Sequence, residues 1–328
     1  MNIPKPRITI VGLGLIGGSM GLALKEAGVA SVVVGHDKER TVGNQAKKLG
    51  AVDRTDWNLV SACEKSDLII LATPVGAIEA TLKAIGPYLR PGCVVVDTAS
   101  LKGPVLTCAK EILPDGVHFV GGNPILSGSA KGQGGLGAAR ADLFHNSLFC
   151  VVPSPTADPT AVKLVTDLVS ILGAKPLFFD PAEHDGQLAA VEHLPAILAL
   201  AMMETVMHQP TWRELRKVAG SAFEANTHLV TIDPTAHSDL YLSNRDNLLH
   251  WIDLFSASLA SIRQALADNQ SEAIAERFKN ALEERGKWLL DRAEGRWHEG
   301  HQQEMPSKTS MVDSLFGTFW RRTLKKEP

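Results

Sequence analysis

The stretch "RITIVGLGLIGGS" (residues 7–19) contains an apolar, β-branched run that leads into a cluster of glycines and then into a helical pattern. A strand followed by G-x-G-x-x-G at the start of a helix is typical of a dinucleotide-binding βαβ unit. The first glycine permits a tight turn, the second lets a pyrophosphate approach the backbone, and the third lets helix and strand pack closely. Backbone N–H groups at the helix start favour phosphate binding. The predicted cofactor-binding residues of this loop are Gly12, Gly14, Leu15, Ile16 and Gly17.

An acidic residue ends the second apolar run, "SVVVGHD" (31–37). A carboxylate at this place accepts hydrogen bonds from the ribose 2′-hydroxyl and repels a 2′-phosphate. Asp37 therefore favours NAD over NADP, whereas the positive charges of Lys38 and Arg40, which follow it, work against that preference.

Apolar strand patterns alternate with helical patterns through the first half of the chain. Strands that are nearly all apolar and separated by helices indicate an α/β fold, with a Rossmann-type parallel sheet covered on both faces. The expected strands are 7–11, 31–37, 67–74 and 92–99, extended by 117–122, 147–153 and 174–180. The expected helices between them are 17–27, 40–49, 76–89 and 159–172.

From about residue 181 the pattern becomes helical, with few glycines. Helices are expected over 182–207, 211–226, 239–268 and 271–294. We therefore predict an NAD-binding domain over residues 1–180, an all-α substrate and dimerisation domain over 181–298, and a linker with a basic amphipathic tail over 299–328. Long apolar helices that one layer cannot bury alone predict a homodimer.

Composition excludes several classes of protein. The net charge of −3 argues against nucleic acid or an anionic membrane as the main partner. The cysteines Cys63, Cys93, Cys108 and Cys150 form no CxxC pair, which argues against a disulfide framework or a metal site. No signal peptide precedes the first strand, and "LPAILALAMM" (194–203) is shorter than the roughly 20 residues of a membrane span. We expect a buried helix there and a soluble, cytoplasmic protein.

Several further stretches, in order, resemble the prephenate/arogenate dehydrogenases of tyrosine biosynthesis over about residues 7–295. They are "VGLGLIGGS" (11–19), "LATPV" (71–75), "DTASLKG" (97–103), "FVGGNPILSG" (119–128), "AEHD" (182–185), "EHLP" (192–195) and "DPTAHSDLYLSNRDNLL" (233–249). The resemblance implies a nucleotide-binding domain followed by a helical domain that dimerises. It also implies a reaction in which the ring carbon bearing a hydroxyl gives a hydride to NAD, and loss of carbon dioxide aromatises the ring.

The resemblance assigns roles to several residues. Thr73 and Pro74 follow the third strand, where a loop would cover the cofactor. Ser100 corresponds to a serine between nicotinamide and substrate, and its alternative role is a helix N-cap. Lys102 is either a substrate-side cation or a solvated lysine.

The chain departs from the family at substrate positions. The family motif GGHP has a histidine that hydrogen-bonds the hydroxyl being oxidised, and Asn123 replaces it here. Asparagine orients a hydroxyl but accepts no proton, and loss of a general base typically costs about 10²–10⁴ in rate. His228 aligns with an arginine that pairs with a substrate carboxylate, and His237-Ser238 replaces a tryptophan–arginine pair. Ala130 replaces an acidic residue.

The remaining polar residues of the matching motifs each have two interpretations. His193 in "EHLP" is either a substrate contact or a core or cap residue, and His184 with Asp185 is interpreted as part of a helix start. Arg245 is either a carboxylate ligand or an ion-pair partner of Asp246 or Asp239.

Two explanations account for these departures. Either the pocket is retuned for a related acid, with His193, His228 and His237 as new bases or donors, or catalysis has faded and the chain only binds NAD. Random decay should not spare the glycine loop, Ser100 and the "NRDN" stretch together, which favours a working enzyme. The candidates are therefore a prephenate or arogenate dehydrogenase, a dehydrogenase of another cyclic or 3-hydroxy acid, and a non-catalytic NAD sensor.

The tail after residue 310 has apolar residues at helical spacing, followed by Arg321, Arg322, Lys325 and Lys326. Such a segment either lies on an anionic membrane or docks onto its own dimer, and we favour docking.

Overall fold

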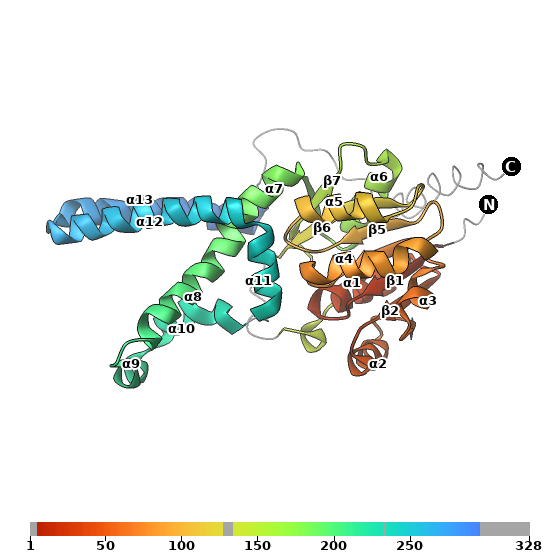
Figure 1. Cartoon of the computed structure of the whole chain (residues 1–328), viewed down its shortest axis with the longest axis horizontal. Coiled ribbons are helices and arrows are strands. Elements are labelled where there is room, and N and C mark those ends of the chain that lie inside the picture. Colours follow the sequence, from red (N-terminus) through yellow and green to blue (C-terminus); the bar gives the residue numbers. More distant parts are fainter. Residues whose placement is uncertain (1–4, 127–133, 232–233, 296–328) are drawn as a thin grey trace. The chain divides into compact units, whose positions relative to one another are not determined.

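The computed structural model describes residues 5–126, 134–231 and 234–295. These residues form two compact units, the first ending at His184 and the second beginning at Asp185. The predicted tail lies outside the described residues. Figure 1 shows the first unit as a sheet flanked by helices and the second as helices alone.

The first unit is built on a single sheet with the strand order β3-β2-β1-β4-β5-β6-β7-β8. The strands are β1 Arg7–Val11, β2 Val32–His36, β3 Arg54–Thr55, β4 Leu68–Leu71, β5 Val94–Asp97, β6 His118–Ile125, β7 Leu148–Pro153 and β8 Lys175–Phe178. The helices are α1 Leu15–Ala27, α2 Arg40–Leu49, α3 Leu59–Cys63, α4 Val75–Ile85, α5 Gly103–Ile112 and α6 Pro159–Ile171, with the short turns η1 Gly86–Tyr88 and η2 Leu136–Ala138.

Alternate residues of the central strands enter two separate cores, as the two-residue period of a strand requires. Ile8 and Ile10 of β1 face a core that contains apolar side chains of α1 and α6. Val11, with Ile69 of β4, faces a second core that contains side chains of α3, α4 and α5. The sheet is therefore covered on both faces, which confirms the predicted fold class.

The sheet differs from the expectation at its far edge. Strands β1 to β6 are parallel, but β7 runs antiparallel to β6, and β8 is parallel to β7. A parallel strand needs a crossover, usually a helix, whereas an antiparallel neighbour does not. Between β6 and β7 the described residues contain only the short turn η2. The short elements β3 and α3 and the helix α5 were not expected from the sequence.

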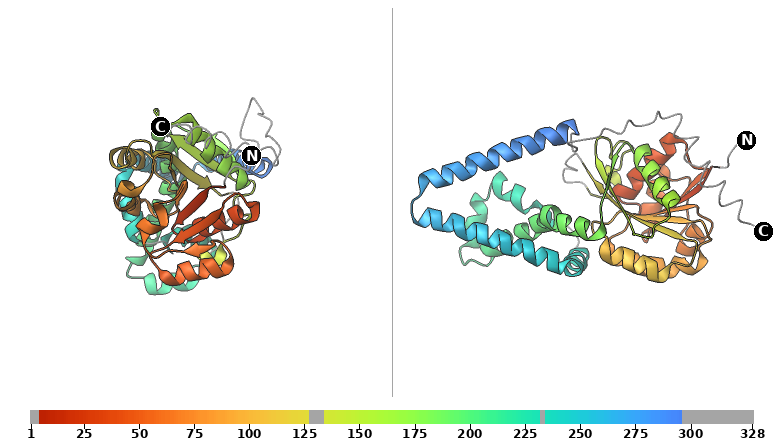
Figure 2. Two further views of the ribbon diagram at one scale, coloured as in Figure 1. Left: turned by 90° about the vertical axis from the view of Figure 1, so that its right-hand side faces the viewer. Right: turned by 90° about the horizontal axis from the view of Figure 1, so that it is seen from above.

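The second unit is entirely helical among its described residues. Its elements are α7 Pro181–Leu188, which begins in the first unit, η3 Ala189–His193, α8 Leu194–Met207, α9 Trp212–Val218, α10 Ser221–Thr227, η4 His228–Thr231, α11 Pro234–Ser243, α12 Arg245–Ala267 and α13 Ser271–Glu294. Helices α12 and α13 meet at the turn that connects them and diverge from it (Figure 2). Element η3 is a π-helical turn, a feature that often marks functional sites.

The helical run expected over 182–207 is present, but the expectation that its apolar stretch 194–203 is buried was wrong. Because α7, η3 and α8 are continuous, they form a helical run over Pro181–Met207 that is long and apolar enough, by length and composition alone, to cross a membrane. Only Leu194 and Ala199 of α8 are buried, and Leu200 and Met202 are exposed. An apolar helix with so much exposed surface calls for a partner.

Candidate active site

The glycine loop adopts the conformation that its sequence predicts. Gly12 has φ +90°, and a Cβ there would lie 2.4 Å from the carbonyl oxygen of Ala72. A Cβ on Gly17 would lie 1.9 Å from the carbonyl oxygen of Gly12, so no larger residue fits at either position. A Cβ on Gly14 would meet nothing within 4 Å, which leaves open space beside the backbone at the helix start.

Helix α1 begins directly after this open space, at Leu15 and Ile16. Its N-cap residue is Gly14, which has no side chain to cap the helix. The first-turn N–H groups and the positive end of the helix dipole are thus directed at the place where an anion would sit.

Asp37 follows β2 and reaches back to the loop. One carboxylate oxygen accepts a hydrogen bond from Leu13 N at 2.8 Å, and the other accepts one from Glu39 N at 2.9 Å. These two hydrogen bonds hold the Asp37 carboxylate beside the glycine loop. Arg40, the predicted opposing charge, instead places its guanidinium 5.3 Å from the centre of the exposed Trp57 ring.

Thr73 and Pro74 lie between β4 and α4, next to the glycine loop across the sheet. The methyl carbon of Thr73 would lie 3.1 Å from a Cβ on Gly12. The Thr73 hydroxyl is buried and has no hydrogen-bond partner in the described part of the chain. Strands β1 and β4 are neighbours where the strand order reverses, which is where dinucleotides bind in such sheets. The cradle at Gly12 and Gly14, together with this orphaned hydroxyl, fits a dinucleotide.

A buried ion pair braces the ends of β5 and β6. The ammonium of Lys102 contacts Asp97, both side chains are 0% exposed, and Lys102 also donates to the carbonyl of Gly122 at 2.8 Å. Asp97 accepts from the N–H groups of Ala99 and Gly122, each at 3.0 Å. A Cβ on Gly122 would lie 2.5 Å from the Asp97 carbonyl, so the double glycine permits this close approach. Lys102 is thus placed to hold the backbone before Asn123.

Ser100 lies between this ion pair and the start of α5. The N-cap residue of α5 is Lys102, and it makes no side-chain capping bond. Ser100 precedes it by two positions, and within the described part of the chain its hydroxyl makes no hydrogen bond to the start of α5. The alternative role that the sequence offered for this serine is therefore not what the structure has.

Asn123 lies on β6, opposite Cys150 of β7, and is 4% exposed. Its amide nitrogen is 3.2 Å from Nε2 of His184, a histidine that is itself fully buried. His184 therefore contacts the substituted position of the GGHP motif, a role that the helix-start interpretation missed.

A second group of polar side chains gathers in the helical unit. His193 is 1% exposed, and its Nδ1 is 3.2 Å from the amide nitrogen of Asn244. The ring of Tyr241 lies 6.0 Å from that of His193 and 5.2 Å from that of His237, and its hydroxyl is hydrogen-bonded to His237 Nδ1. Burial raises the pKa of the Tyr241 phenol, and the negative charge of Glu192 adds a smaller effect in the same direction.

The sequence analysis missed Tyr241 and Asn244, although both stand in the quoted stretch 233–249. The i, i+4 spacing of His237 and Tyr241 on one helix was the available signal, since such residues share a face. No local signal marks Asn244, because its partners Asp185 and His193 lie 59 and 51 positions away in the sequence.

Two other predicted substrate residues occupy exposed positions. His228 is at the end of α10, with Nδ1 2.7 Å from the Ala225 carbonyl oxygen. Arg245 pairs with the adjacent Asp246 at 3.2 Å, and both side chains are exposed, which agrees with its ion-pair interpretation. Ala130 lies outside the described residues.

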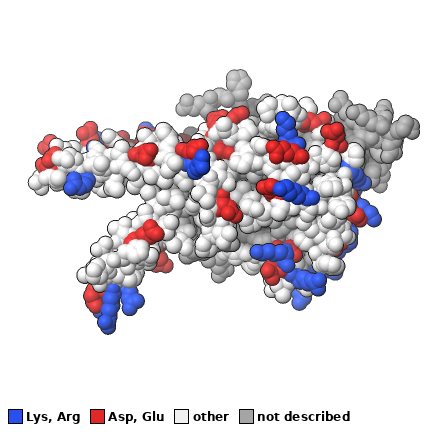
Figure 3. All heavy atoms as spheres, viewed as in Figure 1, with Lys and Arg blue, Asp and Glu red and all other residues white. Residues whose placement is uncertain are grey.

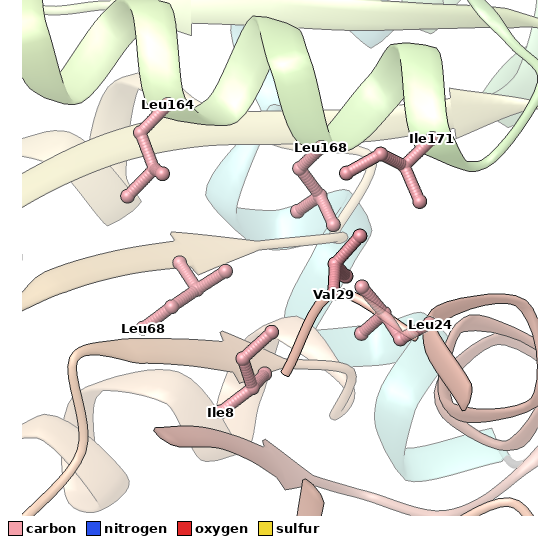
Figure 4. A pocket seen from close by; sticks show the side chains of 7 residues that line it. All are labelled: Ile8, Leu24, Val29, Leu68, Leu164, Leu168 and Ile171. Atoms are coloured by element: carbon pink, nitrogen blue, oxygen red, sulfur yellow. The ribbon is translucent and has the colours of Figure 1, made fainter. Parts of the chain in front are cut away.

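An apolar gap lies between the sheet and helices α1 and α6, near the amino ends of β1 and β4 (Figure 4). It is lined by Ile8, Leu24, Val29, Leu68, Leu164, Leu168 and Ile171. Ile8 and Leu68 stand at the amino ends of their strands, away from the glycine loop, and no polar side chain lines the gap. It is a packing defect between α1, α6 and the sheet. Within the described ranges, no group of His, Cys, Asp and Glu is arranged to hold a metal ion.

Comparisons with known proteins give a consistent picture. The prephenate dehydrogenase nucleotide-binding domain matches residues 20–177, and the prephenate dehydrogenase dimerization domain matches residues 180–280. The chain is 30% identical over 290 residues to a prephenate dehydrogenase of Bacillus subtilis (strain 168), across 87% of this chain and 76% of that protein. It is 27% identical over 280 residues to a cyclohexadienyl dehydrogenase of Zymomonas mobilis, across 85% of this chain and 94% of that protein.

A solved structure of a prephenate dehydrogenase from A. aeolicus, in complex with hydroxyphenyl propionate and NAD+, has the same fold. It superposes with a TM-score of 0.80 at 26% identity and covers 88% of this chain and 99% of that one. The family resemblance of the sequence is therefore confirmed.

Proposed function

Because the chain belongs to the prephenate dehydrogenase family, we propose that it is an enzyme that oxidises and decarboxylates prephenate or arogenate with NAD, as a step of tyrosine biosynthesis. One observation carries the proposal, namely the position of the candidates relative to parallel strands. The glycine loop follows β1, Thr73 follows β4, Ser100 follows β5, and Asn123 lies in the second half of β6. Strands β1, β4, β5 and β6 are parallel neighbours. Carboxyl ends of parallel strands share one edge of a sheet, so the cofactor and substrate candidates of this unit lie on the same edge.

The residues of that edge fit NAD. The N–H groups of Leu15 and Ile16 would hold the pyrophosphate, Asp37 the ribose, and the Thr73–Pro74 turn with its unpaired hydroxyl the nicotinamide end. NAD, when bound, accepts the hydride from the ring carbon that bears the hydroxyl.

Asn123 suits this chemistry although it is no base. In the overall reaction the C–H bond breaks with loss of hydride, and the bond to the ring carboxylate breaks with its electron pair entering the ring. The hydroxyl oxygen of the substrate becomes the phenol oxygen of the product. If the two bond cleavages are concerted, that oxygen never has to give up its proton. An acceptor that orients the hydroxyl is then sufficient, and the amide of Asn123, held through Gly122 and His184, provides one.

Ser100 and His193 are the other catalytic candidates. Both stand in the family motifs quoted from the sequence, and both carry side chains that can donate or accept a hydrogen bond; His193 is buried within the helical unit. His237 and, at the exposed end of α10, His228 remain candidates for carboxylate recognition. Arg245 and Lys102 take other partners, and we assign them structural roles.

We further propose that the protein is a cytoplasmic homodimer formed through the helical unit. Leu259 of α12 and Phe278 and Leu282 of α13 are 55%, 74% and 70% exposed in one chain. Figure 3 shows wide uncharged surface on this unit, interrupted by separate charged side chains. A second subunit, rather than lipid, would cover this surface and the apolar run Pro181–Met207. Sedimentation should give a dimer at micromolar concentration, and a 35 kDa species would contradict it.

The substrate assignment is tested by following NADH absorbance with a panel of acids. We expect turnover of prephenate or arogenate at least tenfold above turnover of other cyclic or 3-hydroxy acids. Preferred turnover of another acid would replace the substrate assignment. Tight NAD binding with no turnover of any acid would favour the sensor.

A further inference from the structure

We propose that Asn244 sets the tautomer of His193, so that the buried imidazole presents an N–H donor rather than a proton acceptor to its ligand. The inference rests on the proposed function only for the identity of that ligand. The arrangement itself lies within the helical unit.

Asn244 lies between α11 and α12 and is 5% exposed. Its amide nitrogen donates to the carbonyl oxygen of Asp185 at 2.9 Å and lies 3.2 Å from Nδ1 of His193. Its amide oxygen accepts from the side-chain nitrogen of Asn247 at 2.9 Å. Three contacts on one buried amide leave it a single orientation.

The backbone carbonyl of Asp185 determines the position of the nitrogen and the oxygen in the side-chain amide of Asn244. A backbone carbonyl only accepts hydrogen bonds, so the amide nitrogen of Asn244 must face it. A flipped amide would set the amide oxygen against the carbonyl oxygen of Asp185, and the amide nitrogen against the side-chain nitrogen of Asn247, in a buried place. The same nitrogen therefore also faces the imidazole of His193.

The tautomer of His193 follows. Because the amide nitrogen is a donor, Nδ1 of His193 must be the acceptor and carries no proton in the neutral ring. The ring proton is then on Nε2, and this nitrogen can only donate. Protonation of Nδ1 would place two N–H groups against each other and break the Asn244 contact.

The tautomer determines what His193 can do to its ligand. A histidine with Nε2–H donates to a hydroxyl or carboxylate oxygen of the substrate, and it does not remove the hydroxyl proton. The π-helical turn that ends at His193 and the N-terminal region of α12 are thus joined through one amide that fixes the chemistry of the ring. Asn244 is a positioning residue in this scheme.

The test is ¹⁵N–¹H correlation spectroscopy of the histidine rings in the full-length protein, with the signal of His193 identified from its loss in His193→Gln. We expect an unprotonated Nδ1 and a protonated Nε2. A proton on Nδ1 would overturn the proposal, whatever the substrate proves to be, and this measurement on the unaltered chain needs no variant of Asn244.

Asn244→Asp provides the second arm. A carboxylate facing Nδ1 favours a proton on that nitrogen, so the tautomer should reverse, and kcat/KM on the substrate that the panel selects should fall at least about tenfold. The exposed Asn269, at φ +54° between α12 and α13, offers the matched control Asn269→Asp, which should change neither quantity. A reversed tautomer with full activity would refute the positioning role. Inactivity of the unaltered enzyme on every acid would refute only the proposed function.

Discussion

Replacing Lys102 by methionine separates two roles for this residue. The sequence suggested a substrate-side cation, whereas the structure buries the ammonium completely against Asp97 and the Gly122 carbonyl. Methionine has a similar length but no charge. Among the described residues, it leaves the buried Asp97 carboxylate with the N–H groups of Ala99 and Gly122 as its partners. Breaking a buried ion pair from one side typically costs about 3–5 kcal/mol.

The assay is urea unfolding followed by circular dichroism. With a slope of about 3 kcal/mol/M, the midpoint of the α/β unit should fall by about 1–2 M. The exposed helical pair of Lys83 with Glu79 gives the control Lys83→Met, which should leave the urea midpoint nearly unchanged because water screens both charges. Removing both charges with Asp97→Asn and Lys102→Met should cost less than the sum of the single changes. An unchanged midpoint with a raised substrate KM would refute the structural role and restore the sequence-based one.

Three further predictions concern cofactor choice, the proton and pH. By calorimetry the unaltered protein should bind NAD at least about tenfold tighter than NADP, and equal affinities would contradict the role of Asp37. Asp37→Asn keeps an acceptor for Leu13 N but removes the charge, so this difference in affinity should become smaller while NAD still binds. Asn123→His should raise kcat by no more than about tenfold and add a pH dependence, whereas a gain of about 10²–10⁴ would mean that a missing base limits the rate. Burial and Glu192 raise the pKa of Tyr241, so its stabilising contribution is complete below the unfolded value of about 10 and is lost as pH rises through the folded value. In Tyr88→Phe, which leaves a single tyrosine, phenolate absorbance should therefore appear with a midpoint above 10, and a midpoint at or below 10 would contradict the assignment.

The fold was predictable where local patterns decide it. The apolar strands, the glycine loop and Asp37 follow from periodicity and from backbone constraints that act within a few residues, as the φ of Gly12 shows. The direction of β7 was not, because strand direction depends on how the chain returns to the sheet after β6 rather than on the strand itself.

The candidate site was predictable only in part. Ser100 and Asn123 were identified through the family motifs, but the partners that hold such residues come from elsewhere in the chain. His184 reaches Asn123 from 61 positions away, and Asn244 reaches His193 from 51. Lys102 was misjudged for the same reason, since a lysine becomes fully buried only when the fold supplies a carboxylate and a carbonyl for it.

The central claim is oxidation coupled to decarboxylation, and it is tested most directly by measuring NADH and carbon dioxide together from one sample of prephenate or arogenate. The account predicts equal amounts of both, with a phenol as the organic product. NADH formed without carbon dioxide, from either acid, would contradict it and identify a simple hydroxy-acid dehydrogenase on the same fold.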